Sequence, residues 1–211
     1  MTHGRFITIE GGEGAGKSTQ LRRLAERLTP RVGPPLQTRE PGGSPGAEAL
    51  RGLLVAGAAD RWSPLAETLI LFAAREDHLR RRIRPALAAG QWVVCDRFSD
   101  STRAYQGAAG GTDPALISAL EAGVIGDTRP DLTLLLDLPA DTGLARAAGR
   151  GGGEARFESK GLAFHERLRS GFLAIAAAEP DRVCVIDASQ SEDAVEAAVW
   201  AAVRQRLGGL A

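Results

Sequence analysis

The stretch IEGGEGAGKSTQL, residues 9 to 21, constrains the fold of this chain more than any other part of the sequence. It contains Gly11-x-x-x-x-Gly16-Lys17-Ser18, preceded by an apolar run and followed by residues with helical spacing. A glycine-rich loop between a strand and a helix turns backbone N–H groups toward an anion, and the helix N-terminus adds partial positive charge. The stretch therefore predicts a βα unit with a phosphate site made of Gly11, Gly12, Glu13, Gly14, Ala15, Gly16, Lys17, Ser18 and Thr19.

Lysine at position 17 is informative because arginine provides nearly all other positive charge; the only other lysine is Lys160. In such a loop the lysine meets the β and γ phosphates of a nucleotide and the Ser18 hydroxyl is a ligand of Mg²⁺. The chain has no asparagine, so it lacks the Asn-Lys-x-Asp guanine reader of GTPases. ATP is the expected nucleotide, although the motif alone names no reaction.

Short β-rich runs alternate with helical patterns along the 211 residues. Helical spacing appears at Leu21, Leu24 and Leu28, and again at Leu65, Leu69, Phe72 and Ala73. This alternation predicts an α/β fold of the P-loop type, with five parallel strands, helices on both faces and all of residues 1–211 in one domain. The strand runs are 5–10, 35–40, 91–97, 131–138 and 182–189.

Three of these runs end in charged residues: Asp96 with Arg97, Asp137, and Asp187. The carboxyl ends of parallel strands form the edge where ligands bind in open α/β sheets. A binding site is expected there.

Composition limits the compartment and the partners. Basic and acidic residues balance at 26 each, which argues against a nucleic-acid partner. No run is apolar enough for a membrane span or a signal peptide. Cys95 and Cys184 each end an apolar run and are expected to be free thiols, so a cytoplasmic protein is expected.

Residues 146–161, RAAGRGGGEARFESKG, break the alternation with clustered glycines among arginines. Glycine raises the conformational freedom of a segment, so we expect a mobile, arginine-bearing flap (LID) between two helices. An ordinary solvated loop is the alternative.

Several segments, in this order and spacing, resemble the bacterial thymidylate kinases over nearly the whole chain. Besides the phosphate loop and the flap they are TREPGGSPG (38–46), LFAAREDH (71–78), DRFSDSTRAYQG (96–107), PDLTLLLDLPADTGLARA (130–147) and VIDAS (185–189). The resemblance implies transfer of the ATP γ-phosphoryl group to dTMP with Mg²⁺, usually by a homodimer. The apolar helical stretches after Pro64 and Asp113 are candidates for the dimer surface.

The resemblance assigns Phe72 to stacking on thymine, Arg75 to a thymine carbonyl, and Tyr105 to the 2′ side of the sugar. The i, i+3 spacing places Phe72 and Arg75 on one helix face. Core packing is the alternative for Phe72, and a solvated position is the alternative for Arg75. Thr102 and Gln106 are placed to reach the base or sugar, or else lie in solvent.

The resemblance also assigns Arg97 to the acceptor phosphate, and an arginine fork suits that group. Asp96 is implied near Mg²⁺, with an ion pair to Arg97 as the alternative. Arg39 and Glu40 match a motif that lies close to the phosphate loop and the acceptor, where they contact substrate or brace the loop. Asp187, Ala188 and Ser189 are implied beside adenine.

The flap departs from many bacterial relatives, which have aspartate where this chain has Ala155. Because the phosphate loop has Glu13 rather than an arginine, the flap arginines are expected to supply charge to the transferring group. Our ranking is Arg156, then Arg150, then Arg146. Glu13 itself is expected to face the acceptor and accept a hydrogen bond from the 3′-hydroxyl, with a solvent-facing side chain as the alternative.

Two other functions remain open from the sequence. One is a kinase for another nucleotide or nucleoside on the same fold, and the other is a non-catalytic protein that binds ATP to switch partners. The acceptor-side residues Phe72, Arg75, Arg97 and Tyr105 favour the thymidylate kinase reading.

Overall fold

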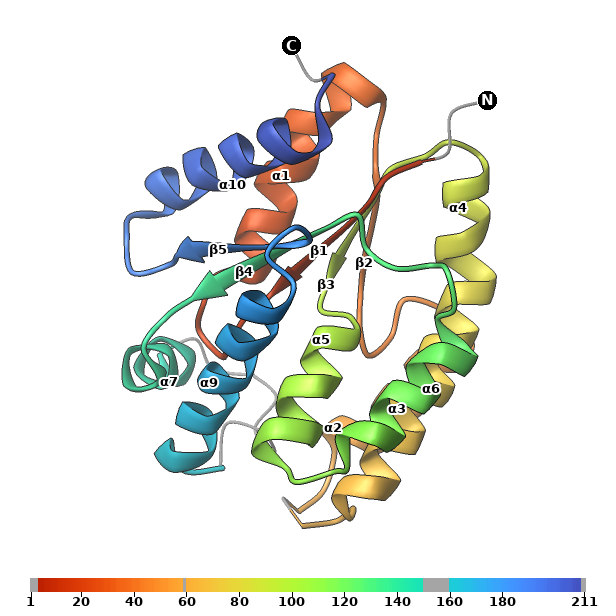
Figure 1. Ribbon diagram of the computed structural model, residues 1–211, viewed down its shortest axis with the longest axis vertical. Coiled ribbons are helices and arrows are strands. Elements are labelled where there is room, and N and C mark those ends of the chain that lie inside the picture. The colour runs from red at the N-terminus through yellow and green to blue at the C-terminus, as the bar shows by residue number, and fades with distance from the viewer. Residues whose placement is uncertain (1–3, 59, 150–159, 210–211) are drawn as a thin grey trace.

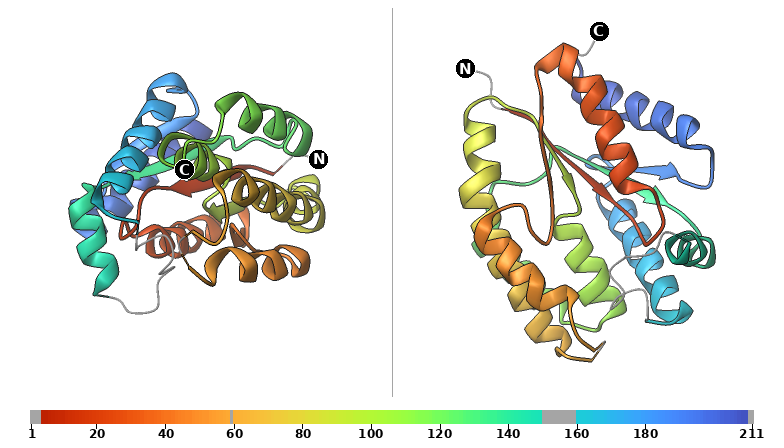
Figure 2. Two further views of the ribbon diagram at one scale, coloured as in Figure 1. Left: turned by 90° about the horizontal axis from the view of Figure 1, so that it is seen from below. Right: turned by 180° about the vertical axis from the view of Figure 1, so that it is seen from behind.

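The computed structural model describes residues 4–58, 60–149 and 160–209, and these form a central parallel sheet with helices on both sides (Figures 1 and 2). The five strands are ordered β2-β3-β1-β4-β5, and every neighbouring pair is parallel. They are β1 Phe6–Glu10, β2 Leu36–Arg39, β3 Val93–Asp96, β4 Leu132–Asp137 and β5 Val183–Asp187. Each lies inside one of the predicted runs, which confirms the predicted fold class.

Helices connect successive strands. They are α1 Lys17–Val32, α2 Pro45–Val55, α3 Pro64–His78, α4 Arg84–Ala88, α5 Ser99–Thr102, α6 Pro114–Val124, α7 Ala140–Ala148, α9 Leu162–Ala178 and α10 Glu192–Leu207. Two wider π-helical segments, η1 Leu79–Ile83 and η2 Arg103–Ala109, continue α3 and α5.

The two faces of the sheet carry different helices because side chains alternate along each strand. Ile7 and Ile9 point toward α1 and α10, where they pack against Leu24 and Val199. Phe6 faces the other side, which η1, α4, α6 and η2 cover. Figure 2 shows this layering, with helices above and below the sheet when it is viewed end-on.

The strand order brings the two most informative sequence segments together. β1 and β3 are far apart in the chain but adjacent in the sheet, with Ile9 opposite Asp96. The Arg97 N–H donates to the Ile9 carbonyl at 3.0 Å, so the loop after β3 starts beside the phosphate loop after β1. This is the carboxyl edge where the site was expected.

The first residues of the predicted flap are helical. Residues 146–148 are the last turn of α7, in which Ala147 is buried and anchors the helix end. Residues 150–159 lie outside the described residues. None of the described helices is long and apolar enough to cross a membrane.

Candidate active site

The phosphate loop adopts backbone angles that glycine permits. Gly11, Gly14 and Gly16 have φ of 142°, 69° and 87°, a region that other residues rarely adopt. α1 begins at Lys17, so its first N–H groups have no partner within the helix and point into the loop. The Lys17 ammonium closes the loop by donating to the carbonyls of Gly11, at 3.2 Å, and Gly12, at 2.8 Å.

Ser18 and Asp96 meet at the mouth of this loop. The Ser18 hydroxyl donates to Asp96 Oδ2 at 2.8 Å, and Ser18 is exposed whereas Asp96 is half-buried. A hydroxyl and a carboxylate are hard oxygen ligands of the kind that Mg²⁺ prefers. The described residues contain no cluster of three His, Cys, Asp or Glu side chains suited to a metal, so an ion here would take its other ligands from phosphate and water.

Glu13 joins the phosphate loop to the loop after β3. Its Oε1 accepts a hydrogen bond from Arg97 at 3.1 Å and another from the Tyr105 hydroxyl at 2.6 Å. None of the described residues donates a hydrogen bond to its other oxygen, Oε2. Arg97 also donates to the Gly11 carbonyl at 2.9 Å and to Ser101 at 3.2 Å, and its guanidinium lies 4.9 Å from the centre of the Tyr105 ring.

The charges around Glu13 decide its ionisation. Burial would raise the pKa of Glu13, but the charges of Arg97 and Lys17 and the Tyr105 hydrogen bond lower it to about 2. The acid in the phosphate loop is therefore ionised and turned away from the loop's centre. Burial, followed by the charge of Arg97, lowers the pKa of Lys17.

The first turns of α7 lie directly against the phosphate loop. A methyl group added at Gly143 would collide with the carbonyl oxygen of Glu13, and one added at Gly14 would collide with the carbonyl oxygen of Gly143. Both positions therefore need glycine for close backbone approach.

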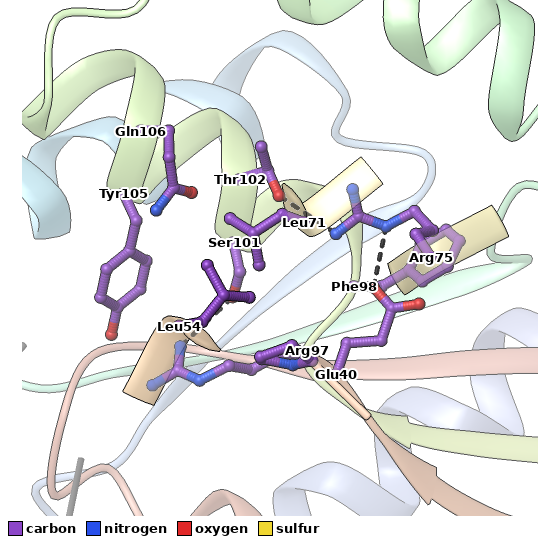
Figure 3. Close-up of a pocket in the computed structure, with 11 residues that line it drawn as sticks. Glu40, Leu54, Leu71, Arg75, Arg97, Phe98, Ser101, Thr102, Tyr105 and Gln106 are labelled. Carbon is purple, nitrogen blue, oxygen red and sulfur yellow. Dashed lines mark hydrogen bonds and ion pairs between the residues drawn. The ribbon is translucent and has the colours of Figure 1, made fainter. Parts of the chain in front are cut away.

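A pocket lies on the side of α3 and η2, and two of the residues that line it, Arg97 and Tyr105, donate hydrogen bonds to Glu13 (Figure 3). Two arginines line opposite ends of it, and the walls between them are largely apolar. Its lining residues are Glu40, Pro41, Leu54, Leu71, Arg75, Arg97, Phe98, Ser101, Thr102, Tyr105 and Gln106.

Arg75 is only 2% exposed, so the alternative of a solvated surface charge is wrong. It donates to Glu40 at 2.8 Å and to the Thr102 hydroxyl at 3.0 Å, and the rings of Phe72 and Phe98 lie within 4.8 and 5.2 Å of its guanidinium carbon. Its remaining nitrogen, NH1, is buried and has no hydrogen-bond partner among the described residues. A buried donor without an acceptor is costly, so a ligand that accepts from NH1 would be bound favourably.

Tyr105, Thr102 and Gln106 all line the pocket, as expected from the sequence. Thr102 and Gln106 are 1% and 3% exposed, so the alternative that they lie in solvent is wrong. The Gln106 amide donates to Glu67 at 2.7 Å. One side chain from α5 and two from η2 therefore line the same cavity.

Phe72 lies in the core rather than on the pocket surface, and its assignment to the thymine base stays a prediction. Phe72 is 2% exposed and packs into the core with Leu79 and Ile83, and it does not line the pocket. Leu71, one residue earlier and four before Arg75, lies on the pocket wall instead (Figure 3). Residues three and four positions before Arg75 both share its helix face, so the sequence did not show whether Phe72 or Leu71 lines the pocket.

Arg39 lies on the phosphate-loop side of the site rather than in the acceptor-side pocket. It pairs with Glu48 at 3.3 Å in an open groove that includes Ser18 and Asp96, and it does not line the acceptor-side pocket. The next residue, Glu40, is 5% exposed and holds both Arg75 and His78 through its two carboxylate oxygens. Strand alternation sends these neighbours to opposite sides.

The loop after β5 is held by its own side chains. Asp187 accepts hydrogen bonds from the Ser189 backbone at 2.9 Å and hydroxyl at 2.6 Å, and the Ala188 carbonyl accepts one from Arg146 at 3.0 Å. Arg146, ranked last for the transferring phosphate, thus contacts the segment predicted to lie beside adenine. Arg150 and Arg156 lie outside the described residues.

Sequence reasoning missed four contributors: Leu71, Phe98, Ser101 and Glu10. Glu10 is fully buried at the end of β1, where it accepts hydrogen bonds from the Phe98 N–H and the Ser101 hydroxyl, both at 2.6 Å. Arg97, directly before Phe98, has a φ of 68°, and Glu10 holds the turn that orients Arg97 through its bonds to Phe98 and Ser101. The only sequence signal for this role was an acid at the end of an otherwise apolar strand.

The comparisons with known proteins agree over nearly the full length. The thymidylate kinase family model matches residues 9–199. A thymidylate kinase of Caulobacter vibrioides is 65% identical over 208 residues, covering 99% of this chain and 100% of the relative. One from Bradyrhizobium diazoefficiens is 54% identical, covering 97% of this chain and 90% of the relative. The crystal structure of the thymidylate kinase from Ehrlichia chaffeensis superposes with a TM-score of 0.79 at 35% identity, covering 95% of this chain and 99% of that one. The chain belongs to the thymidylate kinase family.

Proposed function

We propose that the chain transfers the γ-phosphoryl group of ATP to dTMP, which gives dTDP and ADP. The observation that carries this proposal is the pocket that Arg97 and Arg75 line, because Arg97 is bonded to the phosphate loop through Gly11 and Glu13, and NH1 of Arg75 is buried with no partner among the described residues. A coupled assay that follows ADP formation with ATP and dTMP, dUMP, dCMP, dAMP or thymidine tests it. ADP formation that does not depend on dTMP would contradict it and favour an ATP-driven switch.

The donor nucleotide is assigned to the phosphate loop. Lys17 and the N–H groups at the start of α1 hold the β and γ phosphates, and Thr19 lies on the first turn behind them. The adenine end is assigned to Asp187, Ala188 and Ser189, with Arg146 bracing that segment through its bond to Ala188.

Ser18 and Asp96 are assigned to Mg²⁺. When bound, the ion neutralises charge on the donor phosphates. The hydrogen bond between the two side chains supports the assignment, because it holds both oxygens at the loop's mouth before any ion arrives.

The acceptor is assigned to the pocket with its phosphate toward Arg97 and its base toward Arg75. NH1 of Arg75 donates to a thymine carbonyl, and Leu71 and Phe98 line the apolar wall. Phe72, whose ring centre lies 4.8 Å from the Arg75 guanidinium carbon, remains assigned to stacking on the base. Tyr105, fixed to Glu13, lies at the sugar. Glu13 Oε2 is free to accept a hydrogen bond from the 3′-hydroxyl.

The reaction needs positioning and charge rather than a general base, because the attacking oxygen is already an ionised phosphate. Arg97 links the two sites through its bonds to Gly11 and Glu13, and so fixes the position of the acceptor phosphate relative to the donor phosphates. Arg156 and Arg150 remain assigned to the transferring group. Turnover close to that of the unchanged protein in Arg97→Ala, Arg150→Ala and Arg156→Ala would contradict this mechanism.

A homodimer is proposed through α3 and α6, which pack side by side. Leu65 and Leu69, one turn apart on α3, are 48% and 47% exposed, and α6 exposes Ala115 and Ala119. Exposed apolar surface of this kind favours an interface. Light scattering of Leu69→Arg, expected to be a monomer, tests the surface. A cytoplasmic location is proposed because Cys95 and Cys184 are both free thiols.

A further inference from the structure

Helix α3 presents a line of side chains to the acceptor-side pocket and to η2 behind it. Glu67, Leu71 and Arg75 are spaced four residues apart, so they share one face of the helix. Leu71 and Arg75 line the pocket, and Glu67 lies beneath it at 3% exposure. No part of the phosphate-transfer machinery described above uses Glu67, yet burying a carboxylate is costly unless it is well paired.

One partner of Glu67 is the amide of Gln106. Gln106 Nε2 donates to Glu67 Oε1 at 2.7 Å, and both residues are buried. A carboxylate only accepts hydrogen bonds, whereas an amide has one accepting and one donating end. Glu67 therefore draws the NH₂ end of Gln106 toward itself, and the opposite amide orientation would set two acceptor oxygens against each other.

This orientation leaves the Gln106 carbonyl oxygen as the end that the pocket can use. None of the described residues donates a hydrogen bond to Oε1, and Gln106 lines the pocket. Figure 3 shows the amide at the η2 side of the same cavity that Arg75 enters from α3. The wall therefore offers one acceptor, from Gln106, and one donor, from NH1 of Arg75.

An acceptor and a donor in one wall complement a pyrimidine with an N3–H group beside a 4-carbonyl. Thymine and uracil have that pattern. Cytosine has the reverse one, with an accepting N3 and a donating 4-amino group, and would leave both protein groups mispaired.

We infer that Glu67 is a positioning residue that fixes the amide orientation of Gln106 and thereby selects 4-oxo over 4-amino pyrimidine nucleotides. The inference rests on the proposed function of the pocket. Glu67 acts through Gln106 and does not touch the substrate.

The experiment measures kcat/KM with dTMP and with dCMP for the unchanged protein, Glu67→Gln and Glu67→Asp. The ratio of the two values does not depend on the concentration of folded enzyme, so partial unfolding of a variant leaves it readable. A glutamine at 67 can donate as well as accept, which frees the Gln106 amide to flip. The dTMP/dCMP ratio is expected to fall about 10- to 100-fold in Glu67→Gln, the effect of one mispaired buried polar group. In Glu67→Asp the carboxylate is one methylene further from the Gln106 amide, so the dTMP/dCMP ratio is expected to fall as well, but by less than in Glu67→Gln.

Two controls separate positioning from a structural role. Glu76→Gln removes an exposed carboxylate on the same helix, which pairs with Arg80 at 3.5 Å, and is expected to leave the ratio unchanged. In a Gln106→Ala background, Glu67→Gln is expected to change the ratio by less than twofold, because the amide it positions is gone. The KM for ATP should not respond to either Glu67 variant.

A dTMP/dCMP ratio that stays within twofold in both Glu67 variants would overturn the inference, as would an equal effect of Glu67→Gln with and without Gln106. Failure of the proposed function is distinct, because the unchanged protein would then not phosphorylate dTMP.

Discussion

Replacing Glu13 by glutamine tests the electrostatics of the phosphate loop. Glutamine has the shape of the protonated acid, so the variant lacks the interactions that favour the ionised form. Those interactions lower the pKa of Glu13 from 4.5 to about 2, and the side chain is only 13% exposed. A difference of about 2.5 pH units corresponds to about 3 kcal/mol of folding free energy at neutral pH.

The pH dependence has a definite sign. Because the pKa of Glu13 is lower in the folded protein, its contribution is fully present above pH 4.5 and is lost as the pH falls toward 2. The difference between the unchanged protein and Glu13→Gln should be about 3 kcal/mol at pH 7, should be slightly smaller at pH 4, and should fall to about 1 kcal/mol at pH 3.

Urea unfolding of both proteins at these pH values measures the difference directly. Glu26→Gln, which removes an exposed carboxylate paired with Arg22 on α1, is the matched control and should cost under about 1 kcal/mol. A Glu13→Gln cost below about 1 kcal/mol at pH 7, or one that does not shrink on acidification, would refute the reasoning that Arg97, Lys17 and Tyr105 hold this carboxylate ionised.

Three further predictions concern the neighbouring elements. Gly143→Ala, whose methyl group would collide with the Glu13 carbonyl, should lower kcat/KM for ATP more than tenfold, whereas Gly52→Ala, which has open space around it, should leave it unchanged; steady-state kinetics decide this. Burial and the charge of a neighbouring aspartate raise the pKa of Glu10 to about 8, so stability should be lost as pH rises from 5 toward 8, and Glu10→Gln should flatten that dependence in thermal melts. Asp96→Asn should raise the Mg²⁺ concentration for half-maximal rate about tenfold, as read from a metal titration, and an unchanged titration would remove this carboxylate from the metal site.

The phosphate loop and the five strands could be predicted from the sequence because their signals are local. A glycine at each position of positive φ, a lysine at the helix start and near-continuous apolar runs act within a few residues of one another. The alternation of these runs with helical spacing then fixes the class of fold.

The residues of the acceptor-side pocket could not all be predicted from the sequence, because contacts between distant segments decide which side chains line it. The helical pattern of α3 identified the helix face but not whether Leu71 or Phe72 lines the pocket. The two side chains are about 100° apart around the helix, and the way α3 packs on the rest of the fold decides that Leu71 lines the pocket and Phe72 lies in the core. Likewise, the side chains of Arg39 and Glu40 point to opposite sides of the chain, so that Glu40 lines the pocket and Arg39 does not. The pairing of Glu67 with Gln106 spans 39 residues, and no local pattern marks it.

The sequence by itself determined the class of fold, the phosphate loop and, through its resemblance, the reaction to expect. Only the tertiary structure decided which side chains face the acceptor and how their polar atoms are oriented. The physical reason is that propensity and periodicity act over one turn or strand, whereas the direction of a buried hydrogen bond depends on which partner the packed chain places within about 3 Å of it.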